Sequence, residues 1–279
     1  GLSTPSEIGS SPANGSSSVG AAGVTAAATT GPHALRTARM CAAVAQRLGH
    51  GPERVRQYQI ACLLHDLGRA GLDRRLFGRI WSWARSHGVP TRPREWRARH
   101  PKTPYGRETE AFLRLHKAAL EAEGICMDRW GCEQVEMRLG YARRLARCLK
   151  TVKPSLRDLG VIWSGWMGTV MLYYYYPEKL ARSRPWVKQL GEVLVACEQF
   201  EAYSNQRRGR DYYVRKQEKL SDAFAYLDEL KREGILSAAV VEALRGLTAE
   251  GAFDAVLEEA RGRAITGGER RLLRQMTGG

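Results

Sequence analysis

The sequence lacks a segment long and apolar enough to cross a membrane, and its cysteines lack the spacing that would staple a small fold. The longest apolar run, residues 161–176, is broken by polar and glycine residues and falls short of the ~20 residues that a transmembrane helix needs. The six cysteines include no Cys-x-x-Cys pair, which argues against a disulfide framework or a structural zinc knuckle and favours reduced thiols. No basic and apolar leader follows Gly1, so no signal peptide is expected. These absences predict a cytoplasmic protein without a membrane span.

Acidic residues are few compared with basic ones. The 279 residues include 44 Lys and Arg but only 29 Asp and Glu, which gives a formal net charge of +15. Such a surplus favours phosphate-bearing ligands, nucleic acid or an anionic membrane surface as partners, and an arginine-rich solvated surface is an equal alternative. With 43% hydrophobic and 26% charged residues, the chain can form a sizeable core, which excludes disorder throughout and a collagen-like fibre.

Hydrophobic periodicity predicts an all-α fold. Residues 1–32 are mostly Gly, Ala, Ser, Thr and Pro with Glu7 as their one charge, so we predict a disordered linker there. From His33 onward, apolar residues recur at steps of three and four, which is the pattern of helices. Helices are predicted over 33–48, 53–67, 93–100, 106–123, 132–150, 158–176, 186–204, 216–233, 237–246, 252–262 and 268–276. The β-branched and aromatic residues 170–176 would also suit a strand.

The predicted helices divide the chain beyond the linker into two parts. Residues 33–246 are expected to form one helical bundle, which contains a helical insertion at residues 126–185. Residues 247–279 are expected to add a C-terminal extension of short helices.

Residues 63–72, Leu-Leu-His-Asp-Leu-Gly-Arg-Ala-Gly-Leu, carry the most informative chemistry. His65 and Asp66 are adjacent at the end of an apolar helix, and Gly68 and Gly71 allow a tight turn there. One imidazole and one carboxylate can thus be offered to a metal ion from a single helix end. By spacing alone, a His-Asp dipeptide is more often a surface or capping pair.

Three further segments of the chain carry patterns that are informative together with this one. His33 stands 32 residues before His65 and begins a His-x-x-Arg pattern with Arg36. Residues 93–101 contain Glu-Trp and end in His-Pro. Residues 197–202, Cys-Glu-Gln-Phe-Glu-Ala, continue to arginines at 207 and 210. Together, the four segments resemble the HD superfamily of metal-dependent phosphohydrolases, and in particular its HD-GYP subgroup, over roughly residues 33–125 and 186–246.

The resemblance implies an HD-domain-like helical bundle that binds one or two divalent ions. By this resemblance, the first metal site would consist of His33, His65, Asp66 and Glu198. A second ion would have His100 as a ligand. The phosphate of the substrate would be bound by Arg69, Arg207 and Arg210. Asp66 and Arg69 are the expected catalytic residues. A mixed set of imidazoles and carboxylates suits Fe, Mn, Zn or Ni, and a bound ion would activate water for attack on phosphorus.

The sequence departs from the subgroup at several positions: Glu198 stands where the family usually has Asp, Arg69 replaces a Lys, and one whole element lacks its histidines. The subgroup's His-His-Glu-x-x-Asp-Gly-x-Gly-Tyr-Pro would fall on residues 126–131 or on residues 173–177, and both histidines are absent from either place. Cys126 is a candidate substitute ligand, although a buried structural thiol is the more common role. The loss of two imidazoles argues against a second bound ion and against activity toward cyclic di-GMP.

Three functions remain open at this stage. The first is a metal-dependent phosphohydrolase or phosphodiesterase that acts on a nucleotide or cyclic dinucleotide through metal-activated water, and the second is a degenerate HD-GYP-like signalling or nucleotide-binding module behind an upstream sensory domain. The third is a basic nucleic-acid-binding protein that uses residues 69–107, where 11 basic and 2 acidic residues surround three tryptophans. The aromatic residues near Trp163 suggest core packing or a homodimer interface.

Overall fold

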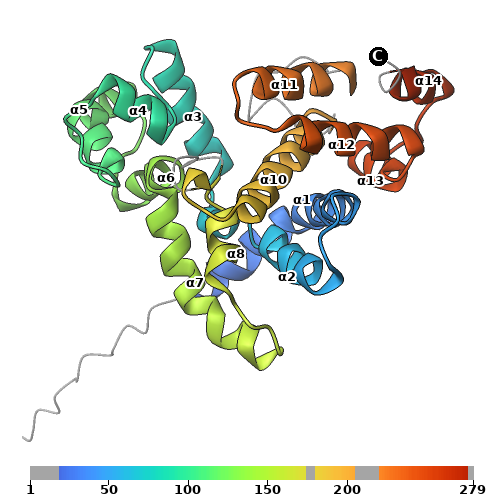
Figure 1. Cartoon of the computed structure of the whole chain (residues 1–279). Helices are drawn as coiled ribbons and strands as arrows, with labels where there is room; N and C mark the ends of the chain where they lie inside the picture. The colour runs from blue at the N-terminus through green and yellow to red at the C-terminus, as the bar shows by residue number, and fades with distance from the viewer. Residues whose placement is uncertain (1–18, 174–179, 205–219, 276–279) are drawn as a thin grey trace, which may run out of the picture.

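The fold was determined as a computed structural model that describes residues 19–173, 180–204 and 220–275 (Figure 1). Every regular element in these ranges is helical, which confirms the all-α prediction. The elements are α1 (Val19–Arg47), α2 (Pro52–Leu63), the 3-10 helix η1 (Leu67–Arg69), α3 (Arg74–Ser86), α4 (Pro93–Arg99), α5 (Glu108–Ala122), α6 (Arg129–Leu139), α7 (Tyr141–Asp158), α8 (Gly165–Val170), α10 (Pro185–Ser204), α11 (Leu220–Arg232), α12 (Ala238–Glu250), α13 (Asp254–Arg261) and α14 (Gly267–Gln275). In the described part of the chain, no helix has both the length and the hydropathy to cross a membrane.

Local sequence explains where several helices begin. Asp73 precedes α3, and its carboxylate accepts a hydrogen bond of 3.0 Å from the backbone N–H of Leu76. Asp128 precedes α6 and accepts one of 2.9 Å from the backbone N–H of Gly131. These contacts satisfy donors that the first helical turn leaves unpaired. Helix α2 begins with Pro52, whose missing N–H costs no helical hydrogen bond at that position.

Helix α1 starts earlier than the sequence predicts. Residues 19–32 form its first part, although their composition predicts a disordered linker. This segment is rich in alanine, which has the highest helix propensity, and that preference outweighs the glycines and threonines beside it. The rest of the predicted linker, residues 1–18, lies outside the described residues.

Helix α10 is at the centre of the larger core. It packs against α1, α8, α11, α12 and α13, and Figure 1 shows it crossing the middle of the molecule. Its apolar residues, among them Leu190, Leu194 and Phe200, are buried against Met40 and Val44 of α1 and against residues of α11 and α12. A helix with such a largely apolar surface is expected in the interior of a bundle.

A second core lies between α3, α4, α5 and α6, which Figure 1 shows on the opposite side of α10 from α11–α14. Helix α3, over residues 74–86, is not among the helices predicted from the sequence. The buried side chains Phe77, Ile80, Trp81 and Ala84 have the spacing of one helical face, but the arginines between them hide this pattern among basic residues. Trp81 and Trp96 are core residues here and are not available to stack on bases.

Helices α7 and α8 connect the two cores and occupy much of residues 126–185. Tyr141, Leu145 and Met167 form a third apolar cluster with Ala61 of α2. The single helix predicted over residues 132–150 is two helices, α6 and α7, which are separated at Gly140. Residues 171–173 form a turn and not a strand, and residues 174–176 of the alternative strand lie outside the described part of the chain.

We expect Leu244→Ala in α12 to lower the free energy of unfolding by about 2–5 kcal/mol, because it removes a fully buried side chain and leaves a cavity. The matched control is Leu159→Ala, which truncates a leucine that is 78% exposed and is expected to change stability by less than about 0.5 kcal/mol. Urea denaturation followed by circular dichroism measures both. Equal losses in the two variants would contradict the assignment of the core.

Candidate metal centre

The His-Asp pair lies in a turn between α2 and η1. Helix α2 ends at Leu63, and the backbone N–H of His65 donates to the carbonyl of Cys62 at 3.3 Å, which tightens the chain as it leaves the helix. A side chain at Gly68 would collide with the ring of Tyr141, the first residue of α7. The hydroxyl of Tyr141 donates to the backbone carbonyl of His65. The turn is therefore held between α2 and α7.

The imidazole of His65 has one nitrogen that is hydrogen-bonded and one that has no partner among the described residues. Its Nδ1 lies 2.7 Å from the carbonyl oxygen of Cys62, so Nδ1 carries the proton and donates it. The residue is 5% exposed, and among the described residues its buried Nε2 has no hydrogen-bond partner. A buried nitrogen with a lone pair and no donor costs free energy unless another group binds it.

His33 reaches the same place from α1. Its Nδ1 lies 2.5 Å from Oε2 of Glu201, a residue of α10 that is 1% exposed. The other oxygen of Glu201 accepts from Nε and Nη2 of Arg36 at 2.9 and 2.7 Å. The rings of His33 and His65 meet edge to face, with centroids 5.3 Å apart. Because Nδ1 of each ring is engaged, each presents Nε2 as its free ligand atom.

Asp66 completes a group of three potential ligands. One ligand atom from each of His33, His65 and Asp66 lies within 4.8 Å of the others. Oδ2 of Asp66 is 3.8 Å from Nε2 of His65, and Oδ1 accepts from Nη1 of Arg69 at 2.9 Å. This is the one such group of three or more in the described part of the chain.

A small cavity of about 10 Å³ adjoins this group, and His65, Asp66, Arg69 and Glu198 line it together with apolar residues. Burial lowers the pKa of His65, but the carboxylates of Asp66 and Glu198 and the hydrogen bond to the carbonyl of Cys62 together outweigh that effect, and the net pKa is raised above the ordinary value. The field at His65 therefore favours a positive charge. The cavity has room for about one water-sized group.

The other predicted site residues lie in different places. The ring of His100 stacks on Trp96 at the end of α4, with centroids 4.3 Å apart, and is not part of the His33, His65 and Asp66 group. Cys126 is exposed near the start of α6. The predicted phosphate-binding residues Arg207 and Arg210 lie outside the described residues. Of the two places considered for the missing subgroup element, one begins at Tyr173, and that residue lines the cavity beside His65.

A family model of the HD domain matches residues 30–118. The match supports an HD superfamily phosphohydrolase, a class that uses divalent metal ions. It covers α2 to α4, most of α5 and the part of α1 that carries His33, so it includes the His65-Asp66 pair and excludes α10. No curated protein and no solved structure matches the chain.

The residues of this HD domain segment fit a divalent transition metal. Two neutral imidazoles and a carboxylate are ligands that Fe, Mn, Zn and Ni accept, whereas Mg prefers oxygen ligands alone. The unpartnered Nε2 of His65 supports this fit, because the carboxylates of Asp66 and Glu198 act on the same ring and favour a positive charge there.

The sequence pattern does not predict the role of Glu201. The residue belongs to the segment 197–202, and the structure makes it the partner of both His33 and Arg36. The sequence contains features that could have indicated this contact. Glu201 is three residues after Glu198 on one predicted helix, and its partners are the His and Arg of the His-x-x-Arg pattern.

We expect Glu201→Ala to lower the free energy of unfolding by about 3–5 kcal/mol, because it leaves the guanidinium of Arg36 buried without its main partner. Glu259→Ala is the matched control, since Glu259 also pairs with Arg36 but is 42% exposed, and less than about 1 kcal/mol is expected there. Urea denaturation measures both. If Glu259→Ala lowers the free energy of unfolding as much as Glu201→Ala does, the buried contact between Arg36 and Glu201 is not the main stabilising contact of Arg36.

Proposed function

We propose that the chain is a phosphodiesterase of the HD-GYP type whose divalent ion is held by His33, His65 and Asp66, with Glu198 as a fourth ligand. The observation that carries the proposal is the buried Nε2 of His65, which has no partner among the described residues and lies within reach of ligand atoms of His33 and Asp66. Glu198 lines the adjoining cavity and raises the pKa of His65, which supports its role. Fe, Mn, Zn and Ni are the ions that this ligand set suits.

Each protein group has a defined task in this proposal. The bound ion would act as a Lewis acid that makes water a nucleophile at neutral pH and neutralises phosphate oxygens. Glu201 and the carbonyl of Cys62 fix the Nδ1 proton of each imidazole, so that both Nε2 atoms stay available as ligands. Arg69 orients the carboxylate of Asp66 and adds a cation at the cavity for a phosphate oxygen.

The proposed substrate is a nucleotide or a cyclic dinucleotide such as cyclic di-GMP. The cavity of about 10 Å³ is too small for such a molecule, so a phosphodiester would meet the ion and Arg69 at the mouth of the cavity. One ion per chain is proposed, since His100 stacks on Trp96 and does not join the ligand group.

A second candidate is a degenerate module that binds a nucleotide without hydrolysing it. The absence of both subgroup histidines favours this candidate, because a single ion lacks the second Lewis acid that would stabilise the leaving oxygen. The two candidates differ in turnover and agree in metal binding.

We expect the purified protein to contain about one equivalent of Fe, Mn, Zn or Ni and to hydrolyse bis(p-nitrophenyl) phosphate after addition of Mn or Fe. His65→Ala and Asp66→Ala are expected to lose both the ion and the turnover. Elemental analysis and absorbance of released nitrophenolate measure the two quantities.

Two control variants report on the histidines outside the group. His50→Ala is expected to keep metal and turnover, because His50 hydrogen-bonds Gln189 and is not part of the ligand group. His100→Ala is expected to do the same, and loss of an ion in this variant would refute a single-ion centre. A folded protein with an ion but no turnover would identify the degenerate module, and a folded protein that binds no ion would refute both candidates.

A further inference from the structure

A second cavity, of about 400 Å³, lies at the junction of α5, α6 and α7 and shares no lining residue with the cavity beside His65. Most of the residues that line it are charged. The lining residues are Arg107, Thr109, Glu110, Leu113, Arg129, Cys132, Glu133, Glu136, Arg143 and Arg147. The volume lies in the range of ~300–1,000 Å³ that small-molecule sites occupy.

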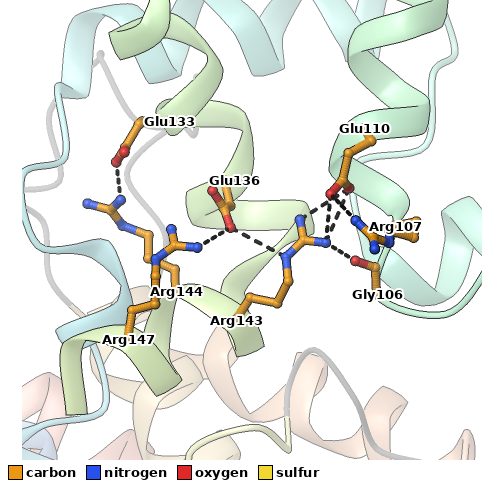
Figure 2. A network of polar contacts seen from close by, with 8 residues as sticks. All are labelled: Gly106, Arg107, Glu110, Glu133, Glu136, Arg143, Arg144 and Arg147. Atoms are coloured by element: carbon orange, nitrogen blue, oxygen red, sulfur yellow. Dashed lines mark hydrogen bonds and ion pairs between the residues drawn. The ribbon is translucent and has the colours of Figure 1, made fainter. Parts of the chain in front are cut away.

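The charged side chains alternate in sign along this wall, as Figure 2 shows. Glu136 lies between Arg147 and Arg143, whose nitrogens are 3.0 and 3.4 Å from its Oε1. Glu110 lies between Arg143 and Arg107, at 3.0 and 3.2 Å. Each carboxylate is thus shared by two guanidinium groups, which leaves N–H donors of the arginines unused.

The lining has a surplus of positive charge. Four arginines face three glutamates, and Arg129 has neither a salt bridge nor a hydrogen bond to any described residue. Arg107 and Arg147 each form a side-chain contact with one carboxylate and are largely exposed, at 67% and 56%. An anion would therefore find guanidinium N–H groups that no protein oxygen occupies.

Thr109 gives an independent indication of a ligand. The residue lines the cavity and is 5% exposed, and its Oγ1 has no hydrogen-bond partner among the described residues. A hydroxyl buried in this way is usually satisfied by protein, water or ligand. A Cβ at Gly140 would approach this Oγ1 to 2.8 Å and Cγ of Glu136 to 2.6 Å, so the glycine preserves the space around the hydroxyl.

We propose that this cavity binds the phosphate groups of a small molecule, either an inorganic diphosphate or the diphosphate of a nucleotide. The guanidinium groups of Arg129, Arg107 and Arg147 donate to phosphate oxygens, for which the planar fork of arginine is well suited. This binding site is separate from the metal centre and does not require it.

The test is isothermal titration calorimetry of the full chain with inorganic pyrophosphate, after removal of divalent ions by a chelating resin. Wild-type protein is expected to bind, and Arg129→Ala is expected to bind about tenfold more weakly, as for the loss of one charge-assisted hydrogen bond. Arg157→Ala is the matched control, because it removes the same charge from an exposed position of α7 outside the cavity. Its affinity is expected to stay within about twofold of wild type.

A further variant tests the sign of the ligand's charge. Glu110→Gln removes a carboxylate that competes for Arg107 and Arg143, so pyrophosphate is expected to bind about threefold more tightly. Weaker binding in this variant would overturn the assignment of an anionic ligand. Circular dichroism verifies that each variant is folded.

Titration with a nucleoside diphosphate separates the two sources of the phosphate group. Tighter binding than that of pyrophosphate supports a nucleotide, and equal binding supports the bare diphosphate. The proposal is overturned if folded wild-type protein does not bind pyrophosphate, if Arg129→Ala and Arg157→Ala lose affinity equally, or if only a single-stranded oligonucleotide binds.

Discussion

The buried carboxylate of Glu201 links the two helices on which the candidate metal centre depends. It accepts hydrogen bonds from His33 and Arg36 of α1 while its own backbone belongs to α10. A guanidinium as buried as that of Arg36 needs an oppositely charged partner, so this pair sets how α1 lies against α10. The same contact engages Nδ1 of His33, which leaves Nε2 as the free ligand atom of a ring that lies beside His65 and Asp66.

Helix α7 supports the centre from the other side. Tyr141 bonds the carbonyl of His65 and fills the space that the absent side chain of Gly68 leaves. Arg144, one turn further on, donates to the carbonyl of Ala70 at 2.6 Å and pairs with Glu133. The His-Asp turn is thus attached to a helix whose outer face lines the second cavity. The two proposed binding sites therefore share one structural element.

Much of the local structure follows from the sequence. The spacing of apolar residues predicts most of the helices, and the Asp and Pro residues at their starts agree with known capping preferences. The failures have local causes: α3 is hidden by arginines, and the alanines of residues 19–32 extend α1. The placement of His65 and Asp66 near the end of a helix depends on only a few neighbouring residues and follows from the sequence, although the helix ends at Leu63 and not at residue 67 as predicted, so the pair lies in the turn beyond it.

The sequence alone determined that the fold is helical and that one imidazole and one carboxylate are adjacent at a helix end, since both depend on short-range periodicity and adjacency. Only the tertiary structure decided which distant residues join them. His33 and Glu201 come together because α1 and α10 pack in the same core, whereas His100 belongs to the core of α3–α6. Such contacts depend on how whole helices pack, and the spacing of residues within a helix does not specify the arrangement of the helices around it.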